Sequence, residues 1–181
     1  VTAPIAFGER HLLPIALEFL KEQPDINLRL TLTDRQLSLR DEHVDVALPI
    51  GHLPDSAIIA TRVGAVRRVI CASPDYLARR GVPRQPEDLA PHDGISFQGF
   101  ATAPEWRYRR DGAAFAVEPR LKLAVNTTEA AIQAALAGIG IIRVLSYQIN
   151  DHLRSGALRE LLAEFAPEPL PVNVIHGPAD P

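Results

Sequence analysis

The sequence predicts an α/β fold, because apolar runs with strand character alternate with segments of helical period along the chain. In residues 27–33, NLRLTLT, every second residue as far as Leu32 is a leucine, the pattern of a strand with one buried face. In residues 11–24, HLLPIALEFLKEQP, leucines recur with Ala16 and Phe19 on one helical stripe. The composition, 46% hydrophobic and 23% charged over 181 residues, suits one large domain or two small lobes. Interleaved strands and helices also predict mostly parallel sheets.

The remaining elements follow in chain order. Further strands are expected at 44–50, 57–63, 66–73, 94–97, 105–110, 121–126, 139–144 and 171–176, with Gly64 separating the second from the third of them. Helices are expected at 11–22, 127–138, 146–156 and 158–165. Pro14 is tolerated only in the first turn of its helix. The middle of the chain, about 90–120, is rich in proline, glycine and aromatic residues and is interpreted as a β-rich excursion.

The stretch SPDYLARRG carries the residues that begin and end a further helix. Ser73 suits the N-cap, Pro74 suits the first helical position, where no N–H is needed, and Asp75 favours the positively polarised helix start. Gly81 supplies a left-handed residue after the last turn. We interpret this stretch as structural.

Candidate catalytic residues are few. The lone Cys71 excludes an internal disulfide, mildly favours a reducing compartment and lies in a strand run, where a thiol is usually a buried hydrophobe. Catalysis would need an activated nucleophile, such as Ser96 beside His92 and an acid. The six histidines have no metal-binding spacing, and His52 and His92 are expected at the surface. We therefore predict no enzyme activity, no metal and no cofactor.

Charge and hydropathy exclude two classes of partner for the chain itself. The formal net charge is −3 and the basic residues are scattered, which disfavours direct binding of nucleic acid. Trp106 and Tyr108, which alternate with arginines, are expected to pack inside a lobe rather than to stack on a base. No membrane span or signal-peptide pattern is present, so a cytoplasmic location without membrane contact is expected. The absence of Met and the opening VTAPIAFG predict a fragment of a longer polypeptide.

Helix starts that follow strand ends are the candidate ligand-binding features, because their free N–H groups and partial positive charge attract a carboxylate. Three turns qualify: residues 2–7, Thr33 with Asp34, and residues 126–129. At the second turn, capping of the next short helix by Asp34 is favoured over ligand contact. At the third turn, the asparagine and the glutamate resemble a capping box, which is compatible with donors from the two intervening threonines.

Two residues near the expected strand 139–144 have open interpretations. Gly140, in the sequence GIGII, allows close approach of either another backbone or a ligand. Arg143 suits an effector counter-charge and an inter-lobe salt bridge equally well.

Several segments occur in the order and spacing of LysR-type transcriptional regulators: VDVALPIGHLPDS, CASPDYLARRGVPRQPEDLAPHDGISF, a tryptophan at 106, LAVNTTEAAIQAALAGIGIIRVLSYQI and LRSGALRELLAEF. The chain resembles the effector-binding domain of this family over essentially all of its length. The resemblance implies two Rossmann-like lobes joined by two crossover strands, as in type 2 periplasmic binding proteins. Lobe I would comprise 1–67 plus 147–181 and lobe II 68–146. The N-terminal helix-turn-helix DNA-binding domain would be absent from this chain.

The resemblance also implies where an effector binds, since in the family it lies between the lobes and touches the turns described above. The expected effector-binding residues are Ala3, Pro4, Ile5, Phe7, Thr33, Ile50, Phe97, Asn126, Thr127, Thr128, Gly140 and Arg143. Pro49 departs from the family pattern, because many relatives carry arginine there. Since proline cannot pair with a carboxylate, either the effector chemistry differs or this position does not serve the ligand.

The expected function is therefore ligand sensing in a bacterial LysR-type transcriptional regulator. A small effector, anionic or aromatic, would control DNA binding and transcription through a homodimer or homotetramer, with DNA contacted through the absent N-terminal domain only. The alternative is a periplasmic solute-binding protein of a transporter. The residues that precede this chain would discriminate, since a helix-turn-helix indicates regulation and a signal peptide indicates transport.

Overall fold

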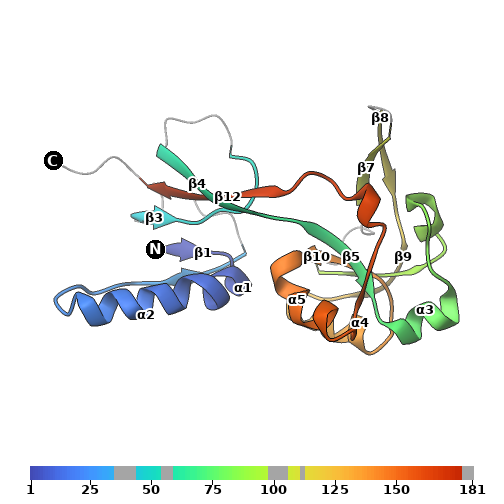
Figure 1. Ribbon diagram of the computed structural model, residues 1–181, viewed down its shortest axis with the longest axis horizontal. Helices are drawn as coiled ribbons and strands as arrows, with labels where there is room; N and C mark the ends of the chain where they lie inside the picture. The colour runs from blue at the N-terminus through green and yellow to red at the C-terminus, as the bar shows by residue number, and fades with distance from the viewer. Residues whose placement is uncertain (35–43, 54–58, 98–105, 111–112, 177–181) are drawn as a thin grey trace. The chain divides into compact units, whose positions relative to one another are not determined.

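The computed structural model describes residues 1–34, 44–53, 59–97, 106–110 and 113–176. The chain forms two compact units, which are Val1–Val66 with Pro169–Pro181, and Arg67–Glu168 (Figure 1). The polypeptide passes from the first unit to the second after Val66 and returns after Glu168. The second unit is thus one continuous segment, whereas the first is completed by the end of the chain.

The first unit contains a five-stranded sheet in the order β2-β1-β3-β12-β4. Its strands are β1 (Thr2–Ala3), β2 (Thr31–Leu32), β3 (Val46–Ala47), β4 (Ile59–Val66) and β12 (Leu170–His176). Strand β1 pairs in parallel with β2 and β3, and β12 pairs antiparallel with β3 and β4. The strand predicted at 27–33 is therefore real, but only its last residues pair with β1.

A helical segment follows β1 directly in the first unit. It comprises α1 (Ile5–Phe7), a wide π-helical turn η1 (Gly8–Leu12) and α2 (Leu13–Glu22). In the wide turn the N–H of Leu13 reaches back to the carbonyl of Gly8, and Pro14, which has no N–H, follows at once. The helix therefore begins earlier than the predicted 11–22. A Cβ at Gly8 would meet the end of the Leu32 side chain, which would have to move.

The second unit is built on an antiparallel sheet in the order β10-β5-β11. Its strands are β5 (Arg68–Ala72), β10 (Ile142–Leu145) and β11 (Arg159–Leu161). Since side chains alternate along β5, Ile70 and Ala72 point to one face and Val69 and Cys71 to the other. All four are buried, so both faces of this sheet are covered.

Each face of that sheet carries its own buried cluster. One face is covered by the hairpin of β7 (Trp106–Arg110) and β8 (Ala113–Val117), and we call its core the hairpin-side cluster. The other face is covered by α4 (Thr128–Leu136) and α5 (Ser146–Arg154), and we call its core the helix-side cluster (Figure 1). The hairpin-side cluster comprises Ile70, Ala72, Tyr76, Leu77, Leu89, Trp106, Tyr108, Val117, Ile141, Leu161 and Leu162. The helix-side cluster comprises Val69, Cys71, Ile95, Ala131, Ile132, Ala135, Ile142, Val144, Ile149 and Leu158.

The remaining elements complete the second unit. Strands β6 (Asp93–Ser96) and β9 (Arg120–Ala124) pair in parallel. Helix α3 (Pro74–Arg80) and the short 3₁₀ helices η2 (Pro86–Leu89) and η3 (Ala163–Phe165) connect the strands. The predicted capping of α3 is confirmed, because the hydroxyl of Ser73 accepts the N–H of Tyr76 and the helix ends at Gly81 with φ of 86°.

Three sequence predictions were wrong in detail. Strand β4 runs through Gly64 without a break, although its pairing with β12 shifts beside this glycine, where Val172 pairs with Gly64 and Asn173 with Arg62. Residues 158–165 form β11 and η3 rather than one helix, because β11 pairs with the free edge of β5. The sheets are not mostly parallel, since β5, β11 and β12 run antiparallel to their neighbours.

The division of the chain also differs from the expected lobes, which assigned 147–181 to lobe I. Residues as far as Glu168 group with the second unit. Strand β11 pairs with β5, and Ile149 and Leu158 belong to the helix-side cluster. These contacts join the whole of α5 and β11 to the second unit.

Candidate functional site

Five of the expected effector-binding residues of the first unit lie at the ends of β1 and β2. Ala3 is buried in β1, and its carbonyl accepts the N–H of Thr33 at 2.9 Å. Pro4 occupies the N-cap position of α1, followed by the exposed Ile5 and the half-buried Phe7. The structure thus brings Ala3 and Pro4 close to Thr33 at the carboxyl ends of two parallel strands.

The carboxylate of Asp34 lies at the same turn. Its Oδ1 accepts the N–H of Ile5 at 3.1 Å, so Asp34 caps the helix that begins after β1. The expected role of Asp34 was capping of the next short helix along the chain, and that role stays a prediction. Residues 35–43, where that helix was expected, lie outside the described residues. Because a side-chain carboxylate already bonds this N–H, the turn after β1 is not a vacant anion site.

Pro49 and Ile50 follow β3, the central strand of the same sheet. The carbonyl of Pro49 accepts the N–H of Asn173 at 3.1 Å, and Ile50 forms a bridge with Val172. Pro49 therefore contributes a carbonyl to the contact with β12, for which its missing N–H is no disadvantage.

In the second unit, the parallel strands β6 and β9 end at the same edge. The N–H of Val125 donates to the carbonyl of Ser96 at 2.8 Å, which brings the half-buried Phe97 to the level of the exposed Asn126. Thr127 is the N-cap of α4, and its hydroxyl accepts the N–H of Ala130 at 3.3 Å. Thr128 is the first residue of the helix and is half-buried.

The capping box predicted from Asn126 and Glu129 is wrong. The N-cap is Thr127, one residue further on, and the Glu129 carboxylate instead accepts the side-chain amide of Gln133 at 2.8 Å. The i,i+4 bond is available because these two residues share one face of the helix. Consequently the side chain of Asn126 does not cap α4.

Gly140 lies against a backbone, which was one of its two open interpretations. A Cβ at Gly140 would collide with the Asp93 carbonyl oxygen and lie 3.0 Å from its carbon. The neighbouring Ile141 exchanges two hydrogen bonds with this region, donating to Asp93 at 2.8 Å and accepting from Ile95 at 2.9 Å. The glycine therefore permits the close approach that these bonds require.

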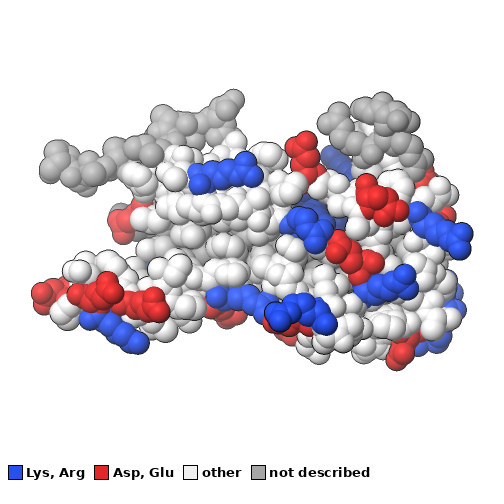
Figure 2. Space-filling view, in the orientation of Figure 1, with Lys and Arg blue, Asp and Glu red and all other residues white. Residues whose placement is uncertain are grey.

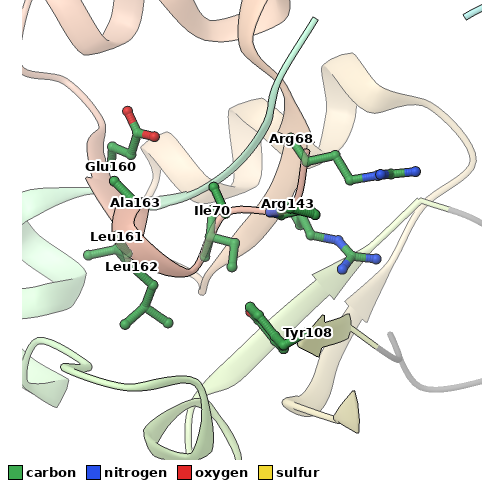
Figure 3. A pocket seen from close by; sticks show the side chains of 10 residues that line it. Arg68, Ile70, Tyr108, Arg143, Glu160, Leu161, Leu162 and Ala163 are labelled. Atoms are coloured by element: carbon green, nitrogen blue, oxygen red, sulfur yellow. The ribbon is translucent and has the colours of Figure 1, made fainter. Parts of the chain in front are cut away.

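Arg143 lies apart from the turn before α4. It pairs with Ile70, so its side chain projects from the face of the sheet that the hairpin covers. Helix α4 packs on the opposite face. Its guanidinium carbon lies 5.6 Å from the centroid of the Trp106 ring, and burial lowers its pKa. With Arg68, Tyr108 and residues of β11, Arg143 lines a small hollow that opens to solvent (Figure 3).

Sequence reasoning missed this hollow. It correctly predicted that Trp106 and Tyr108 are buried, with 3% and 4% of their surface exposed. The alternation of arginines and aromatic residues in 106–110 shows which side chains turn inward. It does not show that the hairpin faces Arg68 and Arg143, because that depends on long-range packing.

His92 is buried, which corrects the expectation of a surface position. Its Nδ1 lies 3.1 Å from the hydroxyl of Tyr76, which also accepts the N–H of Asp93 at 2.8 Å. Because that N–H must donate, the phenolic hydrogen is available for Nδ1, which favours a neutral imidazole. Burial, together with the charge of Arg80, lowers the pKa of His92.

The charges around this histidine form a separate ion-pair group. The Asp93 carboxylate pairs with Arg120 and lies 3.8 Å from the Nε of Arg80. The hydrogen bond from Arg120 holds the pKa of the Asp93 carboxyl below its ordinary value, against the opposing effect of burial. The described hydrogen bonds of these residues thus join His92 to Tyr76 and Asp93 to Arg120, an arrangement that stabilises the fold.

Cys71 and the surface charges agree with the expectations from sequence. Cys71 is fully buried, and burial raises the pKa of its thiol to about 12. Acidic and basic side chains are interspersed on the face that Figure 2 shows.

Within the described ranges, no helix has both the length and the apolar character that a bilayer span needs. The described residues also contain no group of three or more His, Cys, Asp or Glu side chains arranged to hold a metal ion.

Comparison with known proteins gives a consistent picture. The family model described as the LysR substrate binding domain matches residues 1–181. The HTH-type transcriptional regulator YhjC of Escherichia coli (strain K12) is 32% identical over 188 residues, covering 97% of this chain and 60% of that protein. The HTH-type transcriptional regulator CrgA of Neisseria meningitidis serogroup B is 30% identical over 169 residues, covering 92% and 56%. The chain therefore spans less than two thirds of the length of these relatives.

Two solved regulatory domains are also similar. That of CrgA has a TM-score of 0.80 and 26% identity, and the match covers 98% of this chain and 87% of that chain. The regulatory domain of AphB in Vibrio vulnificus has a TM-score of 0.83 and 23% identity, with coverage of 97% and 88%. The fold described above is shared with both.

Proposed function

The chain belongs to the LysR substrate binding domain family, and from this membership we propose that it is the ligand-sensing domain of a bacterial LysR-type transcriptional regulator. The observation that carries the proposal is the family match over residues 1–181. The fold, which is type 2 periplasmic-binding-protein-like, agrees with it. The relatives reported above are transcriptional regulators, which does not favour the alternative of a solute receptor. We infer that the chain acts by binding rather than by catalysis.

The proposed effector contacts are the turns at the carboxyl ends of the parallel strands. In the first unit these are residues 3–7 with Thr33, and in the second unit Phe97 with residues 126–128. Main-chain and side-chain donors at strand ends are the usual ligand-binding groups of open α/β sheets. Ile50, Gly140 and Arg143, which the family resemblance also implies, are engaged elsewhere in their units and contribute less to this proposal.

The chemistry of the two turns indicates which of them would bind an anionic group of the effector. Asp34 accepts the N–H of Ile5, so the first turn presents a carboxylate to its surroundings. The turn before α4 presents the exposed Asn126 amide and the Thr128 hydroxyl at the positive end of a helix. An anionic group of the effector, or the polar group of an aromatic metabolite, would therefore bind at the α4 end.

The sensing mechanism follows from binding energy. A ligand shifts the equilibrium between two states of the chain only by the difference between its affinities for them. A tenfold preference for one state corresponds to about 1.4 kcal/mol. The two chain passages, after Val66 and after Glu168, are where a change in one unit would be transmitted to the other.

We test this proposal with a paired asparagine substitution. A metabolite library would be screened by thermal shift, and each hit titrated by calorimetry against Asn126→Ala and against the control Asn150→Ala, at an exposed position in α5. Asn126→Ala should weaken binding about tenfold through the loss of a buried hydrogen bond to the ligand, without lowering the melting temperature. Equal affinity in both variants would remove the α4 turn from the site. Thr127→Val is unsuitable as the primary test, because it also removes the N-cap.

The wider assembly is part of the same proposal. We propose a cytoplasmic regulator that forms a homodimer or homotetramer and contacts DNA through an N-terminal helix-turn-helix domain. The exposed apolar side chains of α2, Ile15, Leu17 and Phe19, support an oligomer, since such groups on one helix favour contact with another protein surface. Sedimentation velocity of this chain measures its oligomeric state directly.

A further inference from the structure

The hollow beside Arg143 lies between the sheet β10-β5-β11 and the hairpin of β7 and β8, all in the second unit. Its floor is one row across the sheet, because Arg143 of β10, Ile70 of β5 and Leu161 of β11 stand in register. Arg68 lies two residues before Ile70 and therefore on the same face. Its roof is the hairpin side chain Tyr108 (Figure 3). The hollow opens to solvent and its enclosed part has room for about one water-sized group, so it suits the polar end of a small ligand whose remainder lies at the mouth.

The hydroxyl of Tyr108 is the unusual group in this hollow. Only 4% of the residue is exposed, and its oxygen has no hydrogen-bond partner among the described residues. Burial raises the pKa of Tyr108 to about 12, so the group stays protonated and can donate. A buried hydroxyl without a partner is unfavourable, so this geometry favours an occupant that accepts its hydrogen.

Two arginines, Arg68 and Arg143, line the hollow. Arg143 is partly desolvated, and its charge acts on Tyr108. Arg68 approaches closely enough for the two arginines to repel, which also lowers the pKa of Arg143. The acidic residue of the lining, Glu160, bonds instead to the guanidinium of Arg67 at 2.8 Å. In Figure 3 its carboxylate points away from Tyr108. An anion would relieve the repulsion between the two arginines.

The opposite side of the hollow is apolar. Ile70 and Leu162 lie beside the hydroxyl end of Tyr108 (Figure 3). Leu162 has φ of 54°, a left-handed conformation that is strained for leucine and that turns the chain from β11 into η3 around the hollow. The hollow thus pairs cationic and hydrogen-bonding groups with a short hydrophobic wall.

We propose that this hollow binds the carboxylate of a small aliphatic acid at a site distinct from the effector turns. The hydroxyl of Tyr108 donates to one carboxylate oxygen, Arg143 supplies the counter-charge and the hydrocarbon part lies against Ile70 and Leu162. This arrangement satisfies the buried hydroxyl and separates the polar from the apolar parts of the ligand. The site lies entirely within the second unit, whereas the effector turns belong to both.

The test uses sodium isobutyrate as the probe and isobutyramide, its neutral counterpart, as the comparison. Both are titrated into the 181-residue chain by ligand-observed NMR at constant ionic strength. Isobutyrate should bind more tightly than the amide, because only the anion gains the charge of Arg143. Tyr108→Phe should weaken isobutyrate binding about tenfold, and Tyr147→Phe, the same change in α5, should leave it unchanged. Arg143→Gln should abolish the preference for the anion.

The folding of Tyr108→Phe is measured by thermal melting, and its melting temperature should not fall, because an unpartnered hydroxyl is removed from the core. Absence of isobutyrate binding to the unaltered chain would overturn the inference and leave a bound water as the partner of Tyr108. Equal binding by Tyr108→Phe would overturn it too. A probe that loses affinity in Asn126→Ala but not in Tyr108→Phe occupies the effector turns, which would refute this inference while supporting the proposed function.

Discussion

The Ser73 hydroxyl begins helix α3 by accepting the N–H of Tyr76, and it is only 3% exposed. Ser73→Ala should lower the free energy of unfolding by about 1 kcal/mol, because that N–H loses its partner in a place that water reaches poorly. Denaturant unfolding measures the change. Ser155→Ala, at an exposed position whose hydroxyl bonds the His152 carbonyl, is the matched control and should change stability less. Equal stability of Ser73→Ala and the unaltered chain would contradict the capping role.

His92 makes stability depend on pH in a defined direction. Its folded pKa lies below the ordinary value of 6.5, so the unfolded chain binds a proton at a higher pH than the folded chain. The stability associated with neutral His92 is therefore complete above about pH 7 and declines as pH falls through the ordinary value. Protonation of Nδ1 would also leave Tyr76 with two donors facing its oxygen.

The measurement is the free energy of unfolding between about pH 7.5 and 5. His92→Gln, which cannot titrate, should flatten this dependence, whereas His52→Gln at an exposed position should not. The contribution of Asp93 is expected in a separate and more acidic range, because its folded pKa is lowered from 3.8. An unchanged slope in His92→Gln would refute the assignment.

Single residues were predictable from sequence where their role is local. Ser73 and Gly81 cap the helix that they flank, and a capping pattern spans only a few positions. Tyr108 was correctly predicted to be buried, but its unpartnered hydroxyl depends on the hairpin meeting a sheet built from distant segments. The burial of His92 depends in the same way on Tyr76. No local pattern carries such information.

At the scale of the elements, the segment GIGII is constrained by a close backbone contact. Gly140→Ala should destabilise the chain by about 1–3 kcal/mol, because the added methyl would meet the rigid carbonyl of Asp93 rather than a flexible side chain. Gly64→Ala in β4 is the matched control, since a Cβ there has nothing within 4 Å. Chemical denaturation of both variants tests the contrast. If Gly140→Ala were as stable as Gly64→Ala, the close approach would not be what requires glycine.

Element type was predictable where the residue pattern and the end signals agree, as in α3. It was not predictable for 158–165, because LRELLAEF has a helical period while β5 offers a free edge that pairs with Arg159–Leu161. The same limit applies to Gly64, which weakens a strand locally but is held in place by β12. In both cases pairing with a distant strand decides the outcome.

At the scale of the whole molecule, the two units differ in how many large hydrophobic side chains they bury. The hairpin-side and helix-side clusters both lie within Arg67–Glu168. In the first unit the buried hydrophobic residues among those described are small or few, such as Ala3, Ala16 and Ala47, and α2 leaves Ile15 63% exposed. A resemblance to two-lobed proteins predicts that two units exist, but their boundary follows from which side chains bury which strand.

This inequality predicts that the second unit folds by itself. A fragment of residues 67–168 keeps β5 with both of its partners, and its ends are held where Ser146 donates its N–H to the Arg67 carbonyl at 2.9 Å and Glu160 pairs with Arg67. Its length, about 100 residues, is typical of an independent domain. The fragment should unfold cooperatively in a thermal melt followed by circular dichroism, with near-ultraviolet signal from Trp106.

The matched control joins residues 1–66 directly to 169–181 and should not unfold cooperatively, because large apolar side chains among its described residues, such as Ile15, Leu17 and Phe19, are exposed. A non-cooperative melt of the 67–168 fragment would mean that contacts with the first unit complete its core. A cooperative melt would show that both faces of β5 suffice. The hollow beside Tyr108 would then persist in the fragment, because every residue of its lining belongs to the second unit.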